Sequence, residues 1–262
     1  MRGRALFTLV AFLFLVSGCG SNPSNSKNAT PALNGNWAIK AVSQTTGTTY
    51  LGGANLYTAG DTVTGLLHFS NMPCGFTVNG IMYDAPVTGT ISSNGNLRLS
   101  TTDINGLTLT AAGIWSSGVI SSGTYTISGK CEYENGDHGT LTGFPVSPLS
   151  GTYIGTFRSA SGEQVRATMV LSQSGPDSHG IYSLTGTATF SGSPCFSSGT
   201  IDVNAYDFVV GSSVQFPLVT SQGALLFQGQ VTDGTGNTIT GQYEVTAGSC
   251  AGDVGSGSAS RT

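Results

Sequence analysis

Three histidines are the side chains of this chain best suited to acid–base chemistry, and none stands in a catalytic pattern. His68, His138 and His179 form no H-E-x-x-H metal motif, and G-x-S-x-G and phosphate-binding glycine motifs are also absent. Asp177-Ser178-His179 has the residue types of a triad, but catalytic triads are assembled in space and not from adjacent residues. These three residues are expected to form a loop, and neither a catalytic residue nor an enzyme activity is predicted.

One polar cluster could bind a metal ion; its members are Glu132, Glu134, Asp137 and His138. Oxygen ligands of this kind suit a hard cation. The chain repeats this region near its C-terminus and keeps only Asp253 there, so a shared metal site is excluded. The sequence favours a solvated hairpin around Asn135-Gly136, with Asp137 and Asp253 capping turns through side-chain to backbone bonds. No metal and no cofactor are predicted.

The composition indicates a β-rich, folded chain of about two domains. Among 262 residues only 8% are charged and 39 are glycine, while regularly placed apolar residues supply a core. The formal net charge is −4. Nucleic acid is therefore disfavoured as a partner, because no basic patch is available for phosphates.

The N-terminus has the form of an export signal. Arg2 and Arg4 precede an apolar run from Ala5 to Val16 that only Thr8 interrupts, and small residues follow. This run is too short to cross about 30 Å of hydrocarbon as a helix. A cleaved signal over residues 1–18 is predicted in place of a permanent transmembrane anchor.

Val16-Ser17-Gly18-Cys19 resembles the lipobox of bacterial lipoproteins. The resemblance covers residues 1–19 and implies that Cys19 becomes the diacylglyceryl-modified first residue of the mature protein, with the membrane as its partner. Gly20 follows Cys19, which in enterobacterial lipoproteins goes with sorting to the outer membrane. The expected location is the cell envelope, lipid-anchored at the outer membrane. Residues 19–32 lack large apolar side chains and are expected to form a flexible tether.

Internal repetition determines the expected domain organisation. Residues 63–74 and 184–195 both read apolar-T-G-x-x-x-F-S-x-x-P-C, and matches before and after them occur in the same order in both halves. Residues 33–148 and 149–262 are therefore predicted to be two homologous domains.

The four cysteines that remain after Cys19 occur as one equivalent pair in each repeat. They are Cys74, Cys131, Cys195 and Cys250. Four cysteines allow three connectivities, but only pairing within each repeat gives both copies the same closed shape. Export to an oxidising compartment permits such bonds. Two structural disulfides, Cys74–Cys131 and Cys195–Cys250, are predicted.

Period-two alternation and glycine-rich turns predict about eight short antiparallel strands in each copy. Hairpin turns are expected at Asn94-Gly95, Asn105-Gly106, Asn135-Gly136 and Asp233-Gly234. Pro217 lacks an N–H, so its strand is expected at a sheet edge or with its blocked side facing outward. The fold class is all-β, and an up-and-down barrel and a sandwich both stay open.

Gly35-Asn36-Trp37 resembles the G-x-W opening of lipocalins, and Gly151-Thr152-Tyr153 is its counterpart in the second copy. The resemblance is three residues wide and implies a barrel that holds a small apolar ligand. Alternatively, Trp37 and Tyr153 close one end of the core through packing alone.

The function predicted from these features is that of a non-catalytic, membrane-anchored binding module. Carriage of a small apolar ligand inside a barrel is one form of it. The alternative is a structural or surface-interaction lipoprotein, for adhesion or scaffolding, without a small-molecule ligand. An integral outer-membrane barrel ranks last, since each copy is short and a lipid anchor would be redundant. The sequence assigns no ligand-binding residue.

Overall fold

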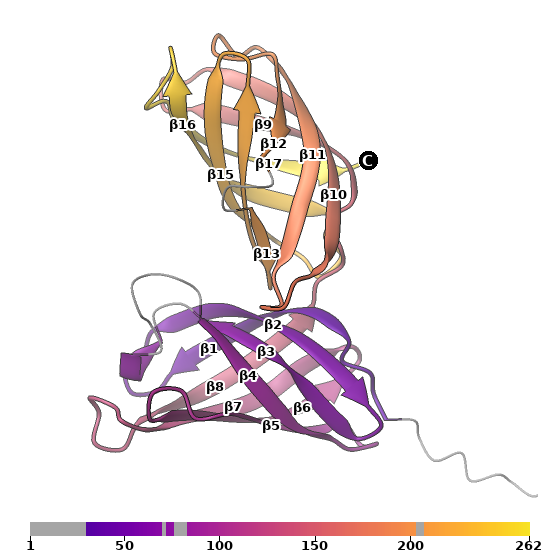
Figure 1. The fold of residues 1–262 in the computed structure, drawn as a ribbon, viewed down its shortest axis with the longest axis vertical. Helices are drawn as coiled ribbons and strands as arrows, with labels where there is room; N and C mark the ends of the chain where they lie inside the picture. The colour runs from indigo at the N-terminus through magenta and orange to yellow at the C-terminus, as the bar shows by residue number, and fades with distance from the viewer. Residues whose placement is uncertain (1–29, 70–71, 76–82, 203–206) are drawn as a thin grey trace, which may run out of the picture.

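The chain folds into two antiparallel β-barrels in tandem (Figure 1). The structure is a computed structural model and describes residues 30–69, 72–75, 83–202 and 207–262. The predicted signal (1–18), Cys19 and most of the predicted tether (19–32) lie outside these residues. In the described part of the chain, no helix is long and apolar enough to span a membrane.

The first barrel is a closed ring of eight strands in sequence order, each paired with its neighbours and β8 paired with β1. The strands are β1 (Gly35–Ser43), β2 (Thr49–Ala59), β3 (Thr62–Phe69), β4 (Tyr83–Ile91), β5 (Asn96–Thr101), β6 (Leu107–Ser116), β7 (Val119–Gly129) and β8 (Asp137–Pro145). A short 3₁₀ turn, η1 (Pro73–Gly75), follows β3.

The second barrel closes in the same way through pairing of β10 with β11. Its strands are β9 (Gly151–Ser159), β10 (Gln164–Pro176), β11 (Tyr182–Ser191), β12 (Ser198–Ile201), β13 (Phe208–Val210), β14 (Ser213–Thr220), β15 (Gly223–Val231), β16 (Thr238–Gly248) and β17 (Val254–Arg261). Because β12 and β13 share one place between β11 and β14, the ring has eight positions. The structure thus confirms two all-β domains and selects barrels over sandwiches.

Alternation along each strand separates a packed interior from a polar exterior. In β9, Tyr153 and Phe157 are buried while Thr156 and Arg158 are exposed. The inward side chains of each barrel form a separate apolar cluster. The four predicted hairpin turns all lie between consecutive paired strands, as expected from their Asn-Gly and Asp-Gly sequences.

Pro217 does not lie on a sheet edge, which was the first of its two expected positions. It lies on β14, inside the closed ring, and pairs with Leu226 of β15. On its other side the ladder is divided, since β14 pairs with β12 through Leu218 and Val219 and with β13 through residues 213–215. The ladder is interrupted where Pro217 cannot donate a hydrogen bond, so the missing N–H is tolerated inside the ring. The alternation of apolar and polar residues does not show where such an interruption occurs.

Both predicted disulfides are confirmed. Cys74 is bonded to Cys131 and Cys195 to Cys250, at sequence separations of 57 and 55. In each barrel the bond joins the segment after the third strand in sequence, β3 or β11, to the segment after the seventh strand position, β7 or β16. The disulfides therefore connect opposite parts of each ring and occupy equivalent places in the two copies.

The second barrel stands with one end against the side wall of the first (Figure 1). The contacting strand is β13, which packs on β1 and β2. The linker between β8 and β9 is also packed: Val146 and Leu149 are buried in the apolar cluster of the second barrel, together with Ala38 of β1. We call this contact the junction; its main residues are Asn36, Gly53, Asn55, His68, Asp84, His179, Gly180, Tyr182, Val210 and Gly211.

Candidate functional site

The interior of the second barrel is filled by its own side chains. A void of about 30 Å³ lies among its inward residues, which include Phe157, Phe216 and Phe227. The rings of Phe216 and Phe227 stack with centroids 4.9 Å apart, and Phe157 meets Phe227 edge-on at 6.0 Å. That space is enough for about one or two water molecules, whereas pockets for small ligands measure about 300–1,000 Å³.

The two aromatic residues of the G-x-W resemblance are buried packing residues. Trp37 donates its Nε1–H to the carbonyl of Leu33 at 2.9 Å. Tyr153 donates its hydroxyl to the carbonyl of Gly236 at 2.7 Å, and the guanidinium of Arg261 lies 5.4 Å from the centre of its ring. Both side chains tie the first strand of a barrel to neighbouring backbone, as expected for residues that close the core.

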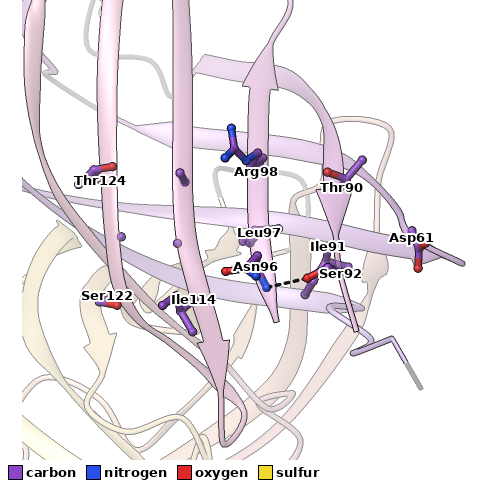
Figure 2. A pocket seen from close by; sticks show the side chains of 13 residues that line it. Asp61, Thr90, Ile91, Ser92, Asn96, Leu97, Arg98, Ile114, Ser122 and Thr124 are labelled. Atoms are coloured by element: carbon purple, nitrogen blue, oxygen red, sulfur yellow. Dashed lines mark hydrogen bonds between the residues drawn. The ribbon is translucent and has the colours of Figure 1, made fainter. Parts of the chain in front are cut away.

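An open groove runs over the outer wall of the first barrel, across β4, β5, β6 and β7 (Figure 2). It is widely open to solvent and has a volume of about 890 Å³. Its polar lining consists of Asp61, Thr90, Ser92, Asn96, Arg98, Ser122 and Thr124. Ile114, which is exposed, and Ala112 supply apolar surface. Figure 2 shows Thr90 and Arg98, which both line the groove, on neighbouring strands, in agreement with their pairing.

The groove lies over a pair of facing glycines next to an irregularity in the sheet. Gly113 of β6 pairs directly with Gly123 of β7, and the register shifts one step further on, between Ile114 and Trp115. A Cβ on Gly113 would come within 2.9 Å of a methyl carbon of Ile120, so the inner side of this glycine is already filled. Paired glycines and a bulge bend a sheet inward, which explains the hollow on the outside.

The second barrel has a shallow hollow over β15, β16, β17 and β9, which overlaps the place of the first groove only at the sixth and seventh strand positions. Gly229 of β15 pairs with Gly241 of β16, the residue that matches Gly123 in the repeat. The groove above this pair encloses about 780 Å³ and is lined by uncharged side chains, among them Gln228, Gln230 and Gln242. The two barrels thus share the glycine pair, while the hollows beside it extend over different strands and differ in lining chemistry.

The polar cluster that the sequence offered as a candidate metal site, and that was judged less favourable than a solvated hairpin, does not assemble. Asp137 is fully buried and points into the first barrel, whereas Glu132, Glu134 and His138 are exposed. The carboxylate of Asp137 accepts hydrogen bonds from the hydroxyls of Ser43 and Tyr125, each at 2.6 Å. Among the described residues, no group of three or more His, Cys, Asp or Glu side chains is placed to hold a metal ion.

The predicted role of Asp137 and Asp253 as turn caps was therefore wrong. In the second barrel the carboxylate of Asp253 accepts a hydrogen bond from the hydroxyl of Tyr243 at 2.9 Å, the counterpart of the Tyr125–Asp137 bond. Both acidic residues bond to side chains on the preceding strand, not to the backbone of their own turn. Burial, followed by the neighbouring carboxylate, raises the pKa of Tyr125 and of Tyr243 above the ordinary value of 10.0.

The Asp177-Ser178-His179 loop is not a catalytic triad. The carboxylate of Asp177 accepts hydrogen bonds from the backbone N–H groups of His179 (2.8 Å) and Ile181 (3.0 Å), so it stabilises its own turn. The ring of His179 reaches the other barrel, where its Nδ1 lies 2.7 Å from Oδ2 of Asp84. This turn, between β10 and β11, is thus part of the junction.

Two asparagines of the first barrel hold the junction together. The side-chain amide of Asn36 donates to the carbonyl of Gly211 at 2.9 Å, and its oxygen accepts from the N–H of Gly211 at 2.7 Å. The amide oxygen of Asn55 accepts from the hydroxyl of Tyr182 at 2.9 Å. Burial raises the pKa of Tyr182 to about 12, so this hydroxyl stays protonated at neutral pH.

The chain matches no known family model and no curated protein.

The junction residues carry no signal that sequence reasoning could have used. Asn36, Asn55 and His68 lie at outward positions of β1, β2 and β3, where polar residues normally face water. They are nevertheless buried, because the second barrel covers them. Only the docked arrangement gives these residues a partner surface.

Proposed function

We propose that this protein is a lipid-anchored, non-catalytic binding protein of the cell envelope that holds its ligand on the outer wall of its barrels. The observation that carries the proposal is that side chains fill the interior of the second barrel, leaving a void of about 30 Å³, while a shallow groove with a polar lining lies open on the outer wall of the first. Of the two forms of binding expected from the sequence, this contrast favours surface interaction over carriage of an apolar molecule.

The groove lining suits a neutral or weakly anionic polar chain, such as a glycan. Hydroxyl and amide side chains such as Thr90, Asn96 and Thr124 both donate and accept hydrogen bonds, which matches the hydroxyl groups of a sugar. Arg98 adds a fixed cation and Ile114 an exposed apolar face. The lining contains neither histidine nor cysteine, in keeping with binding without catalysis.

The groove lies at the end of the barrel where the described chain begins. The hydroxyl of Thr30 donates to the carboxylate of Asp61 at 2.6 Å, and Asp61 lines the groove. A tether that leads from this point to a lipidated Cys19 would keep the groove near the membrane surface. In a Cys19→Ser variant we expect the chain to move from the membrane fraction to the soluble envelope fraction, which fractionation and immunoblotting would measure.

Binding to an array of envelope glycans tests the proposal. Ala112 is exposed and lines the groove, so Ala112→Trp fills the groove without disturbing the core. This variant and Arg98→Ala are expected to lose at least tenfold in affinity for any glycan that the wild type binds. The control is Val170→Trp, at an exposed position of β10 on the other barrel.

Two results would count against surface binding. One is equal glycan binding by Ala112→Trp and the wild type. The other is an apolar small molecule that co-purifies with the intact protein in native mass spectrometry. That result would favour the alternative function, carriage of an apolar ligand inside a barrel. A third result is that the wild type binds no glycan but binds a protein partner, and that Ala112→Trp abolishes this binding. The groove would then remain the binding site, and its ligand would be a protein in place of a glycan.

A further inference from the structure

His68 lies in the junction as a buried side chain whose polar atoms are unsatisfied. It points outward from β3, yet only 1% of it is exposed. Neither Nδ1 nor Nε2 has a hydrogen-bond partner of good geometry among the described residues, and the polar backbone of His179 lies close enough to act on the pKa of the ring. Gly180, with φ of +73°, covers the ring so closely that a Cβ there would lie 3.3 Å from Nε2. Buried polar groups are nearly always hydrogen-bonded, so this exception requires an explanation.

The charged and titratable groups around His68 come from both barrels. Asp84 lies directly across from it on β4, and Asp177 and His179 face it from the β10–β11 turn. The carboxylate of Asp84 is bonded to His179. The neighbouring phenols, Tyr57 on β2 and Tyr182 on β11, bond to Asn55. A proton on His68 would thus place a buried cation beside a carboxylate that His179 already engages.

We propose that the junction is an acid-sensitive joint, in which a neutral His68 allows the two barrels to dock and protonation of His68 separates them. The joint needs no loss of the strand ladder of either barrel, because each has its own closed ring and disulfide, and only Ala38 of the first barrel belongs to the apolar cluster of the second. Separation would expose His68 to water, where its charged form is stable.

The direction of the effect follows from the two histidines. Burial lowers the pKa of His68 below 6.5, although Asp84, the backbone of His179 and Asp177 act in the opposite sense. The separated form therefore binds the proton more readily, so docking is fully favoured above pH 6.5 and weakens as the pH falls below it. His179 acts oppositely, because the hydrogen bond and charge of Asp84 raise its pKa above 6.5 and strengthen docking in acid.

The buried histidine outweighs the exposed one. His179 and Asp84 have side chains that are 63% and 36% exposed, so water and salt screen their attraction. His68 has no such screening. For each unit by which docking lowers the pKa of His68, the ratio of separated to docked protein rises about tenfold once the pH lies below both pKa values.

Hydrogen exchange of the full-length protein in detergent provides the test. The N–H of Gly211 bonds to Asn36 across the junction, so its protection reports docking. We expect protection of the β13–β14 turn and the β10–β11 turn to fall between pH 7.5 and pH 5, after correction for intrinsic exchange rates. Core strands of both barrels serve as the internal reference and should stay protected.

Variants assign the effect to His68. His68→Leu cannot titrate, so its junction should stay protected at pH 5. His138→Gln, on the exposed face of β8, should behave as the wild type. His179→Gln should still open in acid, and more readily. Unchanged protection of the wild-type junction at pH 5, or equal acid opening in His68→Leu, would refute the joint.

His68→Leu is uninformative if its barrels do not dock at any pH. An NMR titration of the histidine rings in the wild type tests the proposal in that case. The chain has three histidines, so their ring signals can be assigned by NMR from single substitutions. The joint requires the ring of His68 to titrate below 6.5 in the docked protein. A midpoint at or above 6.5 would overturn the proposal.

Discussion

At the scale of single residues, the two barrels differ in the surroundings of an equivalent hydrogen bond between a tyrosine hydroxyl and an aspartate carboxylate. The Tyr–Asp pair is common to both barrels, but Ser43 adds a second bond to Asp137 and the site is fully buried. In the second barrel Tyr243 and Asp253 are partly exposed, so water can replace either partner. The same pair of residue types is thus expected to contribute differently to stability.

Asp137→Ala is expected to lower the free energy of unfolding of the first barrel by about 3 kcal/mol, because it leaves two buried hydroxyls without an acceptor. Asp253→Ala should cost the second barrel only about 1 kcal/mol, since one partly exposed hydroxyl is affected. Urea unfolding followed by barrel-specific hydrogen exchange measures both. Equal losses in the two barrels would show that burial does not control the strength of this bond.

Alkaline pH tests the same bonds through their protons. The pKa values of Tyr125 and Tyr243 are raised in the folded protein, so the unfolded chain releases these phenolic protons first. Their contribution to stability is complete below pH 10 and is lost as the pH rises through the folded-state pKa values. The midpoint of urea unfolding should therefore fall between pH 9 and pH 11, and a Tyr125→Phe, Tyr243→Phe double variant should show a shallower fall.

At the scale of elements, local chemistry predicted most of the strands and failed where distant segments meet. Asn105-Gly106 predicted its hairpin correctly because a two-residue turn depends on its own backbone preferences: both residues have positive φ, at 55° and 87°. Pro217 was misplaced because an interrupted ladder depends on a partner strand that is not adjacent in sequence. The hollow at Gly113 and Gly123 was likewise missed. Single glycines in a sequence suggest turns, and the sequence does not show that these two face each other on paired strands.

The disulfides illustrate a long-range contact that sequence could predict, because duplication supplied the missing comparison. Each closes a loop of more than 50 residues, and the chain-entropy model assigns such a crosslink about 4 kcal/mol. Cys74→Ser with Cys131→Ser should lower the stability of the first barrel by about this amount while the second keeps its own. Differential scanning calorimetry, with the Cys195→Ser, Cys250→Ser pair as the reciprocal control, separates the two transitions.

At the scale of the whole molecule, the two barrels contact each other through different surfaces, so the arrangement is not symmetric. The first barrel offers the side of its wall and the second offers one end, so the two copies of each surface have different neighbours. This arrangement leaves the groove on β4 to β7 of the first barrel open. Neither the repeat nor the alternation indicated such docking, since both describe each copy by itself.

Gly53 is the position where docking depends most on the absence of a side chain. A Cβ there would lie 2.4 Å from the backbone nitrogen of Gly211, which real structures do not tolerate. Gly53→Val should therefore separate the barrels without unfolding either, because this side of β2 faces the junction and not the core. Small-angle scattering should show a longer maximum dimension, and circular dichroism an unchanged β signal. Gly175→Ala, with no atom within 4 Å of its added carbon, is the matched control. An unchanged maximum dimension in Gly53→Val would contradict the prediction that the barrels separate. In that case the backbone must have shifted to make room for the side chain, which would break the bonds between Asn36 and Gly211. Loss of hydrogen-exchange protection at Gly211 alone would reveal such a shift.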